Sequence, residues 1–348
     1  MPSVSDFDRF VFVAGAPRCG TTTLAHFLKD HPDVSFPAVK EPHFFAQQDL
    51  RGLPDSELRE VVEDDYLRRF YRRDSSARIG ADASVTYLYT PEQLEPILRL
   101  WPNSRFVVSL RDPLTMLPSL HQRLVYLGDE TIRDFSEAWA AAPDRAAGRR
   151  IPPRCADPRW LRYDEAARFG TYLKRLYAVV GKERCLVLTL DDFVADTRGQ
   201  YRRLMDFIGL EPVPGTDFAP HRSGYAVRFH WLQRLLKRPP GRIREYLAGQ
   251  HFRQRIADVG EAGDESAQQV IWSLRKRLLR WNRQTRPPEP VPLDVQRQIA
   301  GHYQGEIEQL SGLLGRDLSN WLRPGVNGRT RAADPEEQGY RAAYAGSG

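Results

Sequence analysis

Apolar residues along the chain fall into short runs and helical repeats that alternate. Three runs have the length and composition of buried strands: RFVFVA at 9–14, RFVVSL at 105–110 and CLVLTL at 185–190. After the first run, apolar residues recur at helical spacing over 24–28, and the His31-Pro32 step ends that helix. A further helical segment, 165–180, precedes the third run. This alternation predicts an α/β protein in three layers, with a central parallel sheet and helices on both of its faces.

The C-terminal part of the chain has a different pattern. Residues 229–290 are basic and amphipathic, and prolines interrupt them at 239–240 and 287–292. We expect helical segments there that cover the sheet, as a lid does. The stretch 293–322 has a helical pattern, and beyond it Gly, Ala, Arg and Glu predominate. The sequence therefore predicts a single domain over 1–323 and a disordered tail at 324–348.

Composition narrows the class of protein. Hydrophobic residues make up 41% and charged residues 28% of the 348 residues, which excludes a wholly disordered chain, a collagen-like chain and a coiled coil. No apolar run approaches the roughly 20 residues of a transmembrane segment, and MPSVSDFDRF lacks the order of a signal peptide. The prediction is a cytoplasmic protein. The three cysteines, Cys19, Cys155 and Cys185, have no paired spacing, so we expect neither a disulfide framework nor a metal site.

The net charge of the chain is positive, and arginine supplies most of the cations. Lys and Arg number 51 against 45 Asp and Glu, which gives +6, and only six of the cations are lysines. Guanidinium groups bind phosphate and sulfate through paired hydrogen bonds, which favours a polyanionic ligand, although a GC-rich genome produces the same bias. The arginines are spread without a nucleic-acid-binding motif, so we expect no nucleic-acid partner. The sequence predicts no particular oligomeric state.

A glycine-bearing loop, GAPRCGTTT at 15–23, joins the first strand to the first helix. Backbone N–H groups in such a loop, with a helix N-terminus behind them, form a cradle for an anion. The spacing from Gly15 to Gly20 is that of a nucleotide-triphosphatase loop, but Thr21 stands where the lysine of that loop belongs. The cation is Arg18 instead. Ordinary ATP hydrolysis is therefore disfavoured, and a plain strand–helix turn is the alternative interpretation.

The longer run that contains this loop resembles the 5'-phosphosulfate loop of the PAPS-dependent sulfotransferases. GAPRCGTTTLAHFLKDHPDVSFPAVKEPHFF, at 15–45, has their Pro-Lys/Arg-x-Gly-Thr-Thr order, and KEPHFF matches the box of their carbohydrate branch. Four later segments resemble family motifs and follow one another in the family order. The first is a Glu-x-Ser-x-x-Tyr segment at 81–92, with Asp82 in place of Glu, and the second is the 3'-phosphate motif at 105–120. A cofactor-covering loop at 221–236 and the C-terminal signature at 313–322 come next. The resemblance covers about residues 8–322 and implies a P-loop-like three-layer fold.

The resemblance also implies a donor site for 3'-phosphoadenosine 5'-phosphosulfate (PAPS), with no metal. The residues expected to bind this cofactor are Arg18, Cys19, Gly20, Thr21, Thr22, Thr23, Arg111, Ser119 and Arg228. Arg111 and Ser119 are spaced by slightly over two helical turns and would hold the 3'-phosphate. An Arg–Asp surface pair and helix capping by the threonines are the structural alternatives. Two departures are Met116, where an additional Arg often stands, and the lack of an Arg-Lys-Gly triplet around Arg228.

On the acceptor side the resemblance implies that Glu41 is the general base. A carboxylate with an ordinary pKa near 4.3 is a weak base for an alcohol, so we expect partial burial beside Phe44 and Phe45 to raise it. Lys40 is expected to steady the donor sulfate or to pair with Glu41. His43 competes for the role of base, although a structural hydrogen bond suits its position better.

Other polar and aromatic residues have weaker signals. Asp82 and Ser84 are expected to line the acceptor pocket or to form a turn. Asp191 and Asp192 imitate the acidic end of a nucleotide-binding strand, but we interpret them as a strand-end turn. Candidates for stacking on an acceptor, with the protein core as the alternative, are Tyr87, Tyr89, Tyr126 and Trp231.

The predicted function is sulfuryl transfer from PAPS to an acceptor hydroxyl, with release of 3',5'-ADP. The KEPHFF box favours a carbohydrate or glycoconjugate acceptor, and a lipid or secondary-metabolite alcohol is the close alternative. A nucleotide-dependent kinase and a non-catalytic anion-binding protein are the remaining hypotheses.

Overall fold

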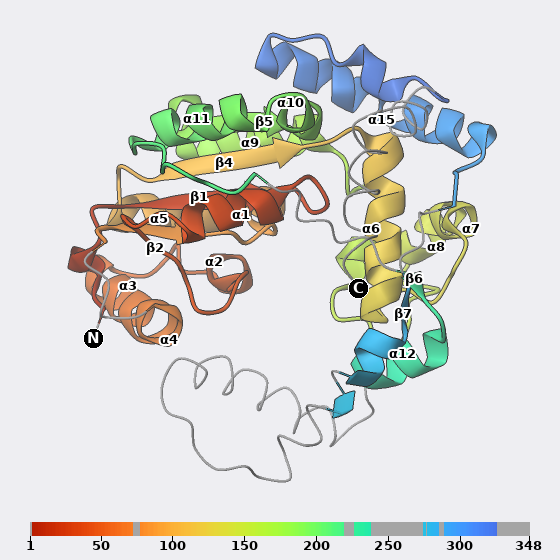
Figure 1. The fold of residues 1–348 in the computed structure, drawn as a ribbon, viewed down its shortest axis with the longest axis horizontal. Coiled ribbons are helices and arrows are strands. Elements are labelled where there is room, and N and C mark those ends of the chain that lie inside the picture. Colours follow the sequence, from red (N-terminus) through yellow and green to blue (C-terminus); the bar gives the residue numbers. More distant parts are fainter. Residues whose placement is uncertain are drawn as a thin grey trace.

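A five-stranded parallel sheet, in the order β2-β3-β1-β4-β5, forms the centre of the molecule (Figure 1). The structure is a computed structural model and describes residues 2–71, 77–218, 226–237, 274–275, 277–284 and 289–325. The strands are β1 (Arg9–Gly15), β2 (Val34–Ser35), β3 (Ile79–Asp82), β4 (Arg105–Leu110) and β5 (Cys185–Thr189). The three apolar runs are therefore confirmed as strands, and the third is one residue shorter than predicted because Leu190 begins a helix.

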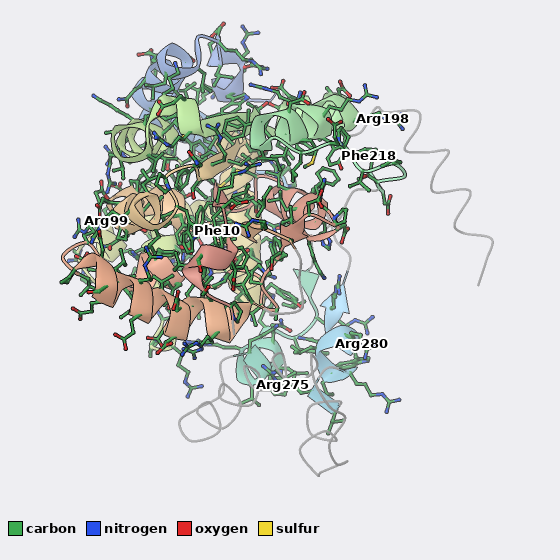
Figure 2. All side chains as sticks on the ribbon, turned by 90° about the vertical axis from the view of Figure 1, so that its left-hand side faces the viewer. Phe10, Arg99, Arg198, Phe218, Arg275 and Arg280 are labelled. Atoms are coloured by element: carbon green, nitrogen blue, oxygen red, sulfur yellow. The ribbon has the colours of Figure 1, made fainter. Side chains whose placement is uncertain are left out.

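Alternate side chains of β1 enter two separate cores, because the sheet is covered on both faces. Val11 and Val13 pack with α1 (Thr21–Lys29), α10 (Leu190–Ala195) and α11 (Thr197–Ile208). Phe10 and Phe12 face the opposite core, and Figure 2 shows Phe10 deep among the surrounding elements. The helices of that second layer are α5 (Glu95–Leu100), α6 (Pro113–Leu127), α9 (Phe169–Val180) and α15 (Leu293–Leu314). The three-layer, P-loop-like α/β prediction is confirmed.

Short helices fill the connections between these elements. Before β3 they are η1 (Val4–Asp6), α2 (Phe44–Gln47), α3 (Asp55–Val61), the π-helical η2 (Val62–Leu67) and α4 (Arg68–Phe70). After β3 they are η3 (Tyr87–Tyr89), η4 (Pro91–Leu94), α7 (Phe135–Ala140), α8 (Ala142–Ala146), η5 (Pro158–Leu161), η6 (Lys182–Arg184) and η7 (Ser319–Leu322). Among the described residues, none of the helices is both long and apolar enough to cross a bilayer.

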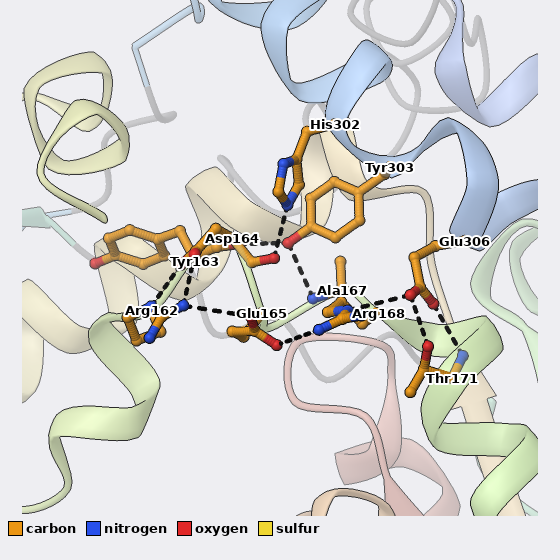
Figure 3. Close-up of polar contacts among 10 residues, drawn as sticks. All are labelled: Arg162, Tyr163, Asp164, Glu165, Ala167, Arg168, Thr171, His302, Tyr303 and Glu306. Carbon is orange, nitrogen blue, oxygen red and sulfur yellow. Dashed lines mark hydrogen bonds and ion pairs between the residues drawn. The ribbon is translucent and has the colours of Figure 1, made fainter. Parts of the chain in front are cut away.

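The C-terminal helix α15 is tied to the segment that leads into α9 (Figure 3). The carboxylate of Glu306 accepts hydrogen bonds from the Thr171 backbone N–H at 2.9 Å and from the Thr171 hydroxyl at 2.7 Å. The hydroxyl of Tyr303 donates to the carbonyl of Tyr163 and accepts from the Ala167 N–H at 3.3 Å. These contacts join residues far apart in the sequence, and the predicted helical stretch 293–322 is confirmed as α15 followed by η7.

A small unit packs against α6 away from the sheet. Strand β6 (Ala226–Val227) pairs antiparallel with β7 (Arg283–Gln284), and α12 (His230–Lys237) contacts α6. Residues 277–281 are helical, and in Figure 2 Arg275 and Arg280 lie in this same unit. These parts of 229–290 are therefore partly helical, and the expectation that the segment covers the sheet as a lid stays a prediction. Residues 238–273 and the predicted tail from 326 onward lie outside the described residues.

Candidate active site at the carboxyl edge of the sheet

The candidate site lies where the connections of the sheet diverge. From β1 the chain passes to β2 and β3 on one side, and it then returns to place β4 on the other side. In open α/β sheets, ligands bind outside the carboxyl ends of the strands at such a switch point. The loop after β1, at 15–20, and the residues after β4, beginning with Arg111, meet here. The sequence signals for an anion site therefore converge at one edge of the sheet.

The loop after β1 has the backbone geometry of an anion cradle. Gly20 precedes α1 with a φ of +83°, and Arg18 has a φ of +65°, which is unusual for a residue with a side chain. Among the described residues, no acceptor is present for the backbone N–H groups of Gly20, Thr21 and Thr22. They are the first donors of a helix, and the macrodipole adds positive potential at this end. The arrangement suits a tetrahedral anion.

Arginines surround this cradle. The Nε of Arg18 donates to the Ser119 hydroxyl at 3.0 Å, and Nη1 of Arg111 donates to the Arg18 carbonyl at 3.4 Å. The Nε of Arg111 also donates to the Thr115 hydroxyl at 2.7 Å. Burial, followed by the charges of Arg123 and Arg111, lowers the pKa of Arg18 to about 10. Arg18 therefore remains cationic at neutral pH, but it is destabilised by its neighbours, and a ligand with several negative charges would relieve that repulsion.

The structure brings Arg111 and Ser119, both predicted to hold the 3'-phosphate, next to Arg18 of the loop, and it adds Arg123 and Thr115, which the sequence analysis did not name. Arg123 lies four residues after Ser119 on α6, which puts both on the same side of the helix. That spacing was visible in the sequence. The exposed guanidinium of Arg123 lies 5.6 Å from the centre of the Tyr126 ring. Thr115 carried no such signal, because its contact depends on the turn that Asp112 caps by accepting from the Thr115 N–H at 2.8 Å.

On the other side of the loop, Lys40, Glu41 and His43 form a connected group. The Nζ of Lys40 donates to Oε1 of Glu41 at 3.1 Å and to the Thr22 hydroxyl at 3.2 Å. The Nε2 of His43 lies 3.4 Å from Oε2 of Glu41. Both Glu41 and His43 have left-handed backbones, with φ values of 62° and 56°, and such conformations cluster at functional sites. Lys40 thus joins the group directly to the anion cradle.

The expected rise in the pKa of Glu41 is wrong. Burial does act to raise this pKa, but the hydrogen bond from His43 and the charge of Lys40 outweigh burial and hold it below its ordinary value. The side chain keeps 32% of its surface exposed, so a partner can reach it. Glu41 is therefore ionised at neutral pH, and it becomes a stronger base only when Lys40 moves away or the hydrogen bond from His43 is lost.

The expectation that Asp82 and Ser84 line an acceptor pocket is also wrong, because both side chains are fully buried. The Ser84 hydroxyl donates to Oδ1 of Asp82 at 2.6 Å and accepts from the His43 N–H at 2.9 Å. Tyr66 and Tyr87 donate to Oδ2 of Asp82 at 2.9 and 2.8 Å. Burial raises the pKa of Asp82 even though three hydroxyls donate to it. The pair acts behind the site and fixes the backbone of His43.

The ring of His43 has a second support that the sequence did not reveal. Its Nδ1 shares a hydrogen bond of 2.9 Å with the Thr86 hydroxyl. Thr86 follows β3 and His43 follows β2, so the two meet only because these strands are neighbours in the sheet. The contact directs Nε2 of His43 toward Glu41.

Two predicted cofactor residues have different surroundings from those expected. Cys19 is fully buried, its N–H donates to Ala16, and burial raises the pKa of its thiol to about 12. Cys19 is therefore a neutral core residue, contrary to the prediction that it contacts the cofactor. Arg228 directly follows β6, and its guanidinium lies 5.8 Å from the centre of the exposed Trp281 ring. The segment 219–225, which precedes it, lies outside the described residues.

The remaining sequence candidates are mostly structural. Tyr87 is fully buried, and the Tyr89 hydroxyl donates to the Ala166 carbonyl at 2.9 Å, so both belong to the core. The expected strand-end turn at Asp191 and Asp192 is wrong, because both lie in the first turn of α10. Among the described residues, no three His, Cys, Asp or Glu side chains are grouped as metal ligands.

The fold and this cradle define a class of enzyme. The chain belongs to the sulfotransferase family, since the family model described as "Sulfotransferase family" matches residues 11–214, more than half of the chain. The matched region contains the loop, the Lys40–His43 group and both Arg111 and Ser119.

Individual relatives are more distant. Mouse heparan sulfate glucosamine 3-O-sulfotransferase 3B1 is 25% identical over 211 residues, covering 58% of this chain and 46% of the relative. Human carbohydrate sulfotransferase 15 is 23% identical over 255 residues, covering 58% and 44% respectively. The chain thus spans about half the length of the curated relatives that it matches. The crystal structure of a sulfotransferase from Alicyclobacillus acidocaldarius has the same fold, with a TM-score of 0.57, 22% identity and coverage of 90% of this chain and 98% of that one.

Proposed function

We propose that this protein transfers a sulfuryl group from PAPS to a hydroxyl of a carbohydrate or glycoconjugate and releases 3',5'-ADP. The observation that carries the proposal is the contact of Lys40 with both Thr22 of the anion cradle and the carboxylate of Glu41. Through it a cationic donor site and a candidate general base adjoin each other. The activities in the names of two matched relatives, a heparan sulfate glucosamine 3-O-sulfotransferase and a carbohydrate sulfotransferase, support a glycan acceptor.

The hydrogen-bond donors and cations of the site fit a nucleotide that carries phosphate groups at both ends. On one side are the backbone N–H groups of Gly20, Thr21 and Thr22, the threonine hydroxyls and Arg18. On the other side Arg111 lies at the start of α6, with Ser119 two turns along the helix. All of these groups donate hydrogen bonds or carry positive charge, which is the chemistry that phosphate and sulfate oxygens require. PAPS itself would supply a sulfuryl group already activated by its phosphate leaving group, so no metal is needed in principle.

In this proposal each residue has a defined task. Arg18 offsets the negative charge that grows on the leaving phosphate, an effect worth several kcal/mol in comparable sites. Lys40 exchanges its contact with Glu41 for a sulfate oxygen, and the loss of that cation raises the pKa of Glu41 toward the range of an effective base. Glu41 then accepts the proton of the acceptor hydroxyl, while His43, oriented by Thr86, holds the carboxylate in place.

Nucleotide preference and sulfate transfer test the proposal together. We expect 3',5'-ADP to raise the melting temperature of the protein more than AMP or Mg-ATP at equal concentration. Radioactive sulfate from labelled PAPS should then appear on members of a saccharide panel. A larger stabilisation by Mg-ATP would favour a kinase and overturn the proposal. Strong 3',5'-ADP binding without transfer to any saccharide, but with transfer to lipid or secondary-metabolite alcohols, would retain the enzyme class and reject the glycan acceptor.

A further inference from the structure

A cavity of about 660 Å³ lies between the C-terminal end of α6, the loops that follow it, and α12. This volume is typical of a site for a small organic ligand. Its apolar walls come from Val125, Pro153, Trp231 and Leu235. Trp231 and Leu235 are 67% and 47% exposed, and they share one apolar surface with Val125 and Pro153 rather than standing singly. These lining residues belong to the part of the chain that the structure describes.

Positive charge accompanies these apolar walls. Arg133, Arg154 and Arg234 line the cavity together with His230. The pKa of His230 is lowered, first by burial and then by the charge of Arg133. The charge of Arg133 therefore contributes positive potential at His230, inside the cavity.

Among the described lining residues the one carboxylate, that of Glu130, does not cancel this charge. Its side chain is fully buried, and Oε2 accepts from the guanidinium of Arg145 at 2.6 Å. Its Oε1 accepts from the backbone N–H groups of Thr131 at 2.7 Å and Ile132 at 2.9 Å. Both oxygens are therefore engaged with the protein, and the negative charge of Glu130 is neutralised by Arg145. Among the described lining residues, positive charge is therefore in excess.

Helix α6 connects the cavity to the candidate active site. Ser119, which contacts Arg18, and Gly128, which lines the cavity, are nine positions apart. At ~1.5 Å per residue this separation is about 13 Å along the helix. Arg123 lies between them on the same helix. Figure 1 shows α6 extending from the sheet edge to α12. At 3.6 residues per turn, nine positions are about two and a half turns, so Gly128 faces away from the side of α6 that carries Ser119.

We propose that this cavity is a second ligand site that binds an amphipathic organic anion, a carboxylate, phosphate or sulfate joined to an apolar body. The arginines would hold the anionic group, and Trp231 and Leu235 would cover the apolar part. This site is distinct from the donor cradle of the proposed function, and its ligand would bind separately from the nucleotide. The ligand preference of the cavity can be measured without any sulfate transfer.

Three matched probes separate charge from apolar contact. Octyl glucuronide carries both features, octyl glucoside lacks the charge, and methyl glucuronide lacks the chain. Binding is measured by calorimetry, with the octyl probes kept below their micelle concentrations. We expect octyl glucuronide to bind with a Kd about tenfold or more below that of either other probe, which is roughly 1.4 kcal/mol. Equal affinity for either partial probe, or no binding of octyl glucuronide, would overturn the proposal.

Paired variants assign the binding to this cavity. The double variant Arg133→Gln/Arg234→Gln should lose about tenfold in affinity for octyl glucuronide and little for octyl glucoside. The control, Arg202→Gln/Arg203→Gln, removes the same charge from exposed positions on α11 and should leave both affinities unchanged. Equal losses in the two double variants would show only a general charge effect and reject the site.

Binding of 3',5'-ADP serves as a second measurement. It detects misfolded variants, and it separates failure of the second ligand site from failure of the proposed function. Each variant must bind 3',5'-ADP as the parent protein does. If the cavity variant fails this check, the parent protein is titrated with NaCl instead, and binding of octyl glucuronide must weaken with salt while that of octyl glucoside does not. If the parent protein itself does not bind 3',5'-ADP but prefers octyl glucuronide, the proposed function fails and the second site stands.

Discussion

Replacing Glu41 with Gln removes one charge and one proton acceptor while keeping the shape of the side chain. The amide oxygen of Gln can still accept from Lys40, whose Nζ lies 3.1 Å from Oε1 of Glu41. General bases contribute about 10²–10⁴-fold to rate. The pKa of Glu41 is held low by its hydrogen bond to His43 and by Lys40, despite the opposing effect of burial. We therefore expect the lower half of that range, a fall in kcat of about 10²–10³-fold, or roughly 3–4 kcal/mol.

Nucleotide binding should respond in the opposite direction. The carboxylate of Glu41 shares the ammonium group of Lys40 with Thr22 of the anion cradle, so its negative charge weakens that cradle. Glu41→Gln should thus leave the affinity for 3',5'-ADP unchanged or improve it up to about threefold. The assay pairs steady-state transfer of labelled sulfate with calorimetric titration of 3',5'-ADP. Glu57→Gln, at an exposed position of α3, is the control and should match the parent protein in both measurements.

Two results would refute this reasoning. A kcat within about threefold of the parent value would remove Glu41 from proton transfer. Parallel losses of kcat and 3',5'-ADP affinity would mean that Glu41 holds the loop in shape rather than acting on the acceptor. The residual activity of Glu41→Gln should fall further in Glu41→Gln/His43→Asn, because Nε2 of His43 is only 3.4 Å from the carboxylate that is replaced.

Three further predictions concern the neighbouring groups. Arg111→Ala should weaken binding of 3',5'-ADP by about 30-fold or more, as expected for a charged hydrogen bond of roughly 2–3 kcal/mol, with little change for AMP; equal losses in calorimetry would contradict a 3'-phosphate contact. Ser84→Ala removes one of the three hydroxyls that donate hydrogen bonds to the buried carboxylate of Asp82. It should lower the free energy of unfolding, measured by urea titration, by about 2–4 kcal/mol. A change within about 0.5 kcal/mol would show that these hydrogen bonds are dispensable. Lys40→Met removes a cation that lowers the pKa of Glu41, so the acid limb of the kcat/KM profile should move to higher pH, because the base is ionised only above its pKa; an unmoved limb would separate Lys40 from the base.

The parts of the fold that the sequence revealed are those with continuous apolar runs. β1, β4 and β5 are buried on both faces and contain five to seven residues of mostly apolar character. β3 was missed because its four residues, Ile79–Asp82, include a glycine and a carboxylate. Gly80 is required there, since an added Cβ would lie 2.3 Å from the Phe10 ring. Glycine has a low propensity for strands, and its place in this strand is explained only by the close packing against Phe10 in the folded protein.

The candidate site was predictable wherever its residues are close in sequence. The loop at 15–23 and the Lys40–His43 group carry their own signals. What the sequence did not supply are the contacts across elements, such as Thr86 with His43 and Lys40 with Thr22. The error about the pKa of Glu41 has the same origin. The adjacent phenylalanines indicated that Glu41 is partly buried. They did not indicate that His43 donates a hydrogen bond to its carboxylate, which lowers the pKa that burial raises.

The crowding of positive charge around Arg18 has a practical consequence for handling the protein. Burial raises the cost of keeping Arg18 protonated, and the charges of Arg123 and Arg111 add to that cost. Any multivalent anion that enters will stabilise the native state by mass action, by about 2.7 kcal/mol at a hundred times its dissociation constant. In the proposed donor site, phosphate or sulfate from a storage buffer would therefore raise thermal resistance while it competes with PAPS. The most durable preparation and the most active one will need different salts.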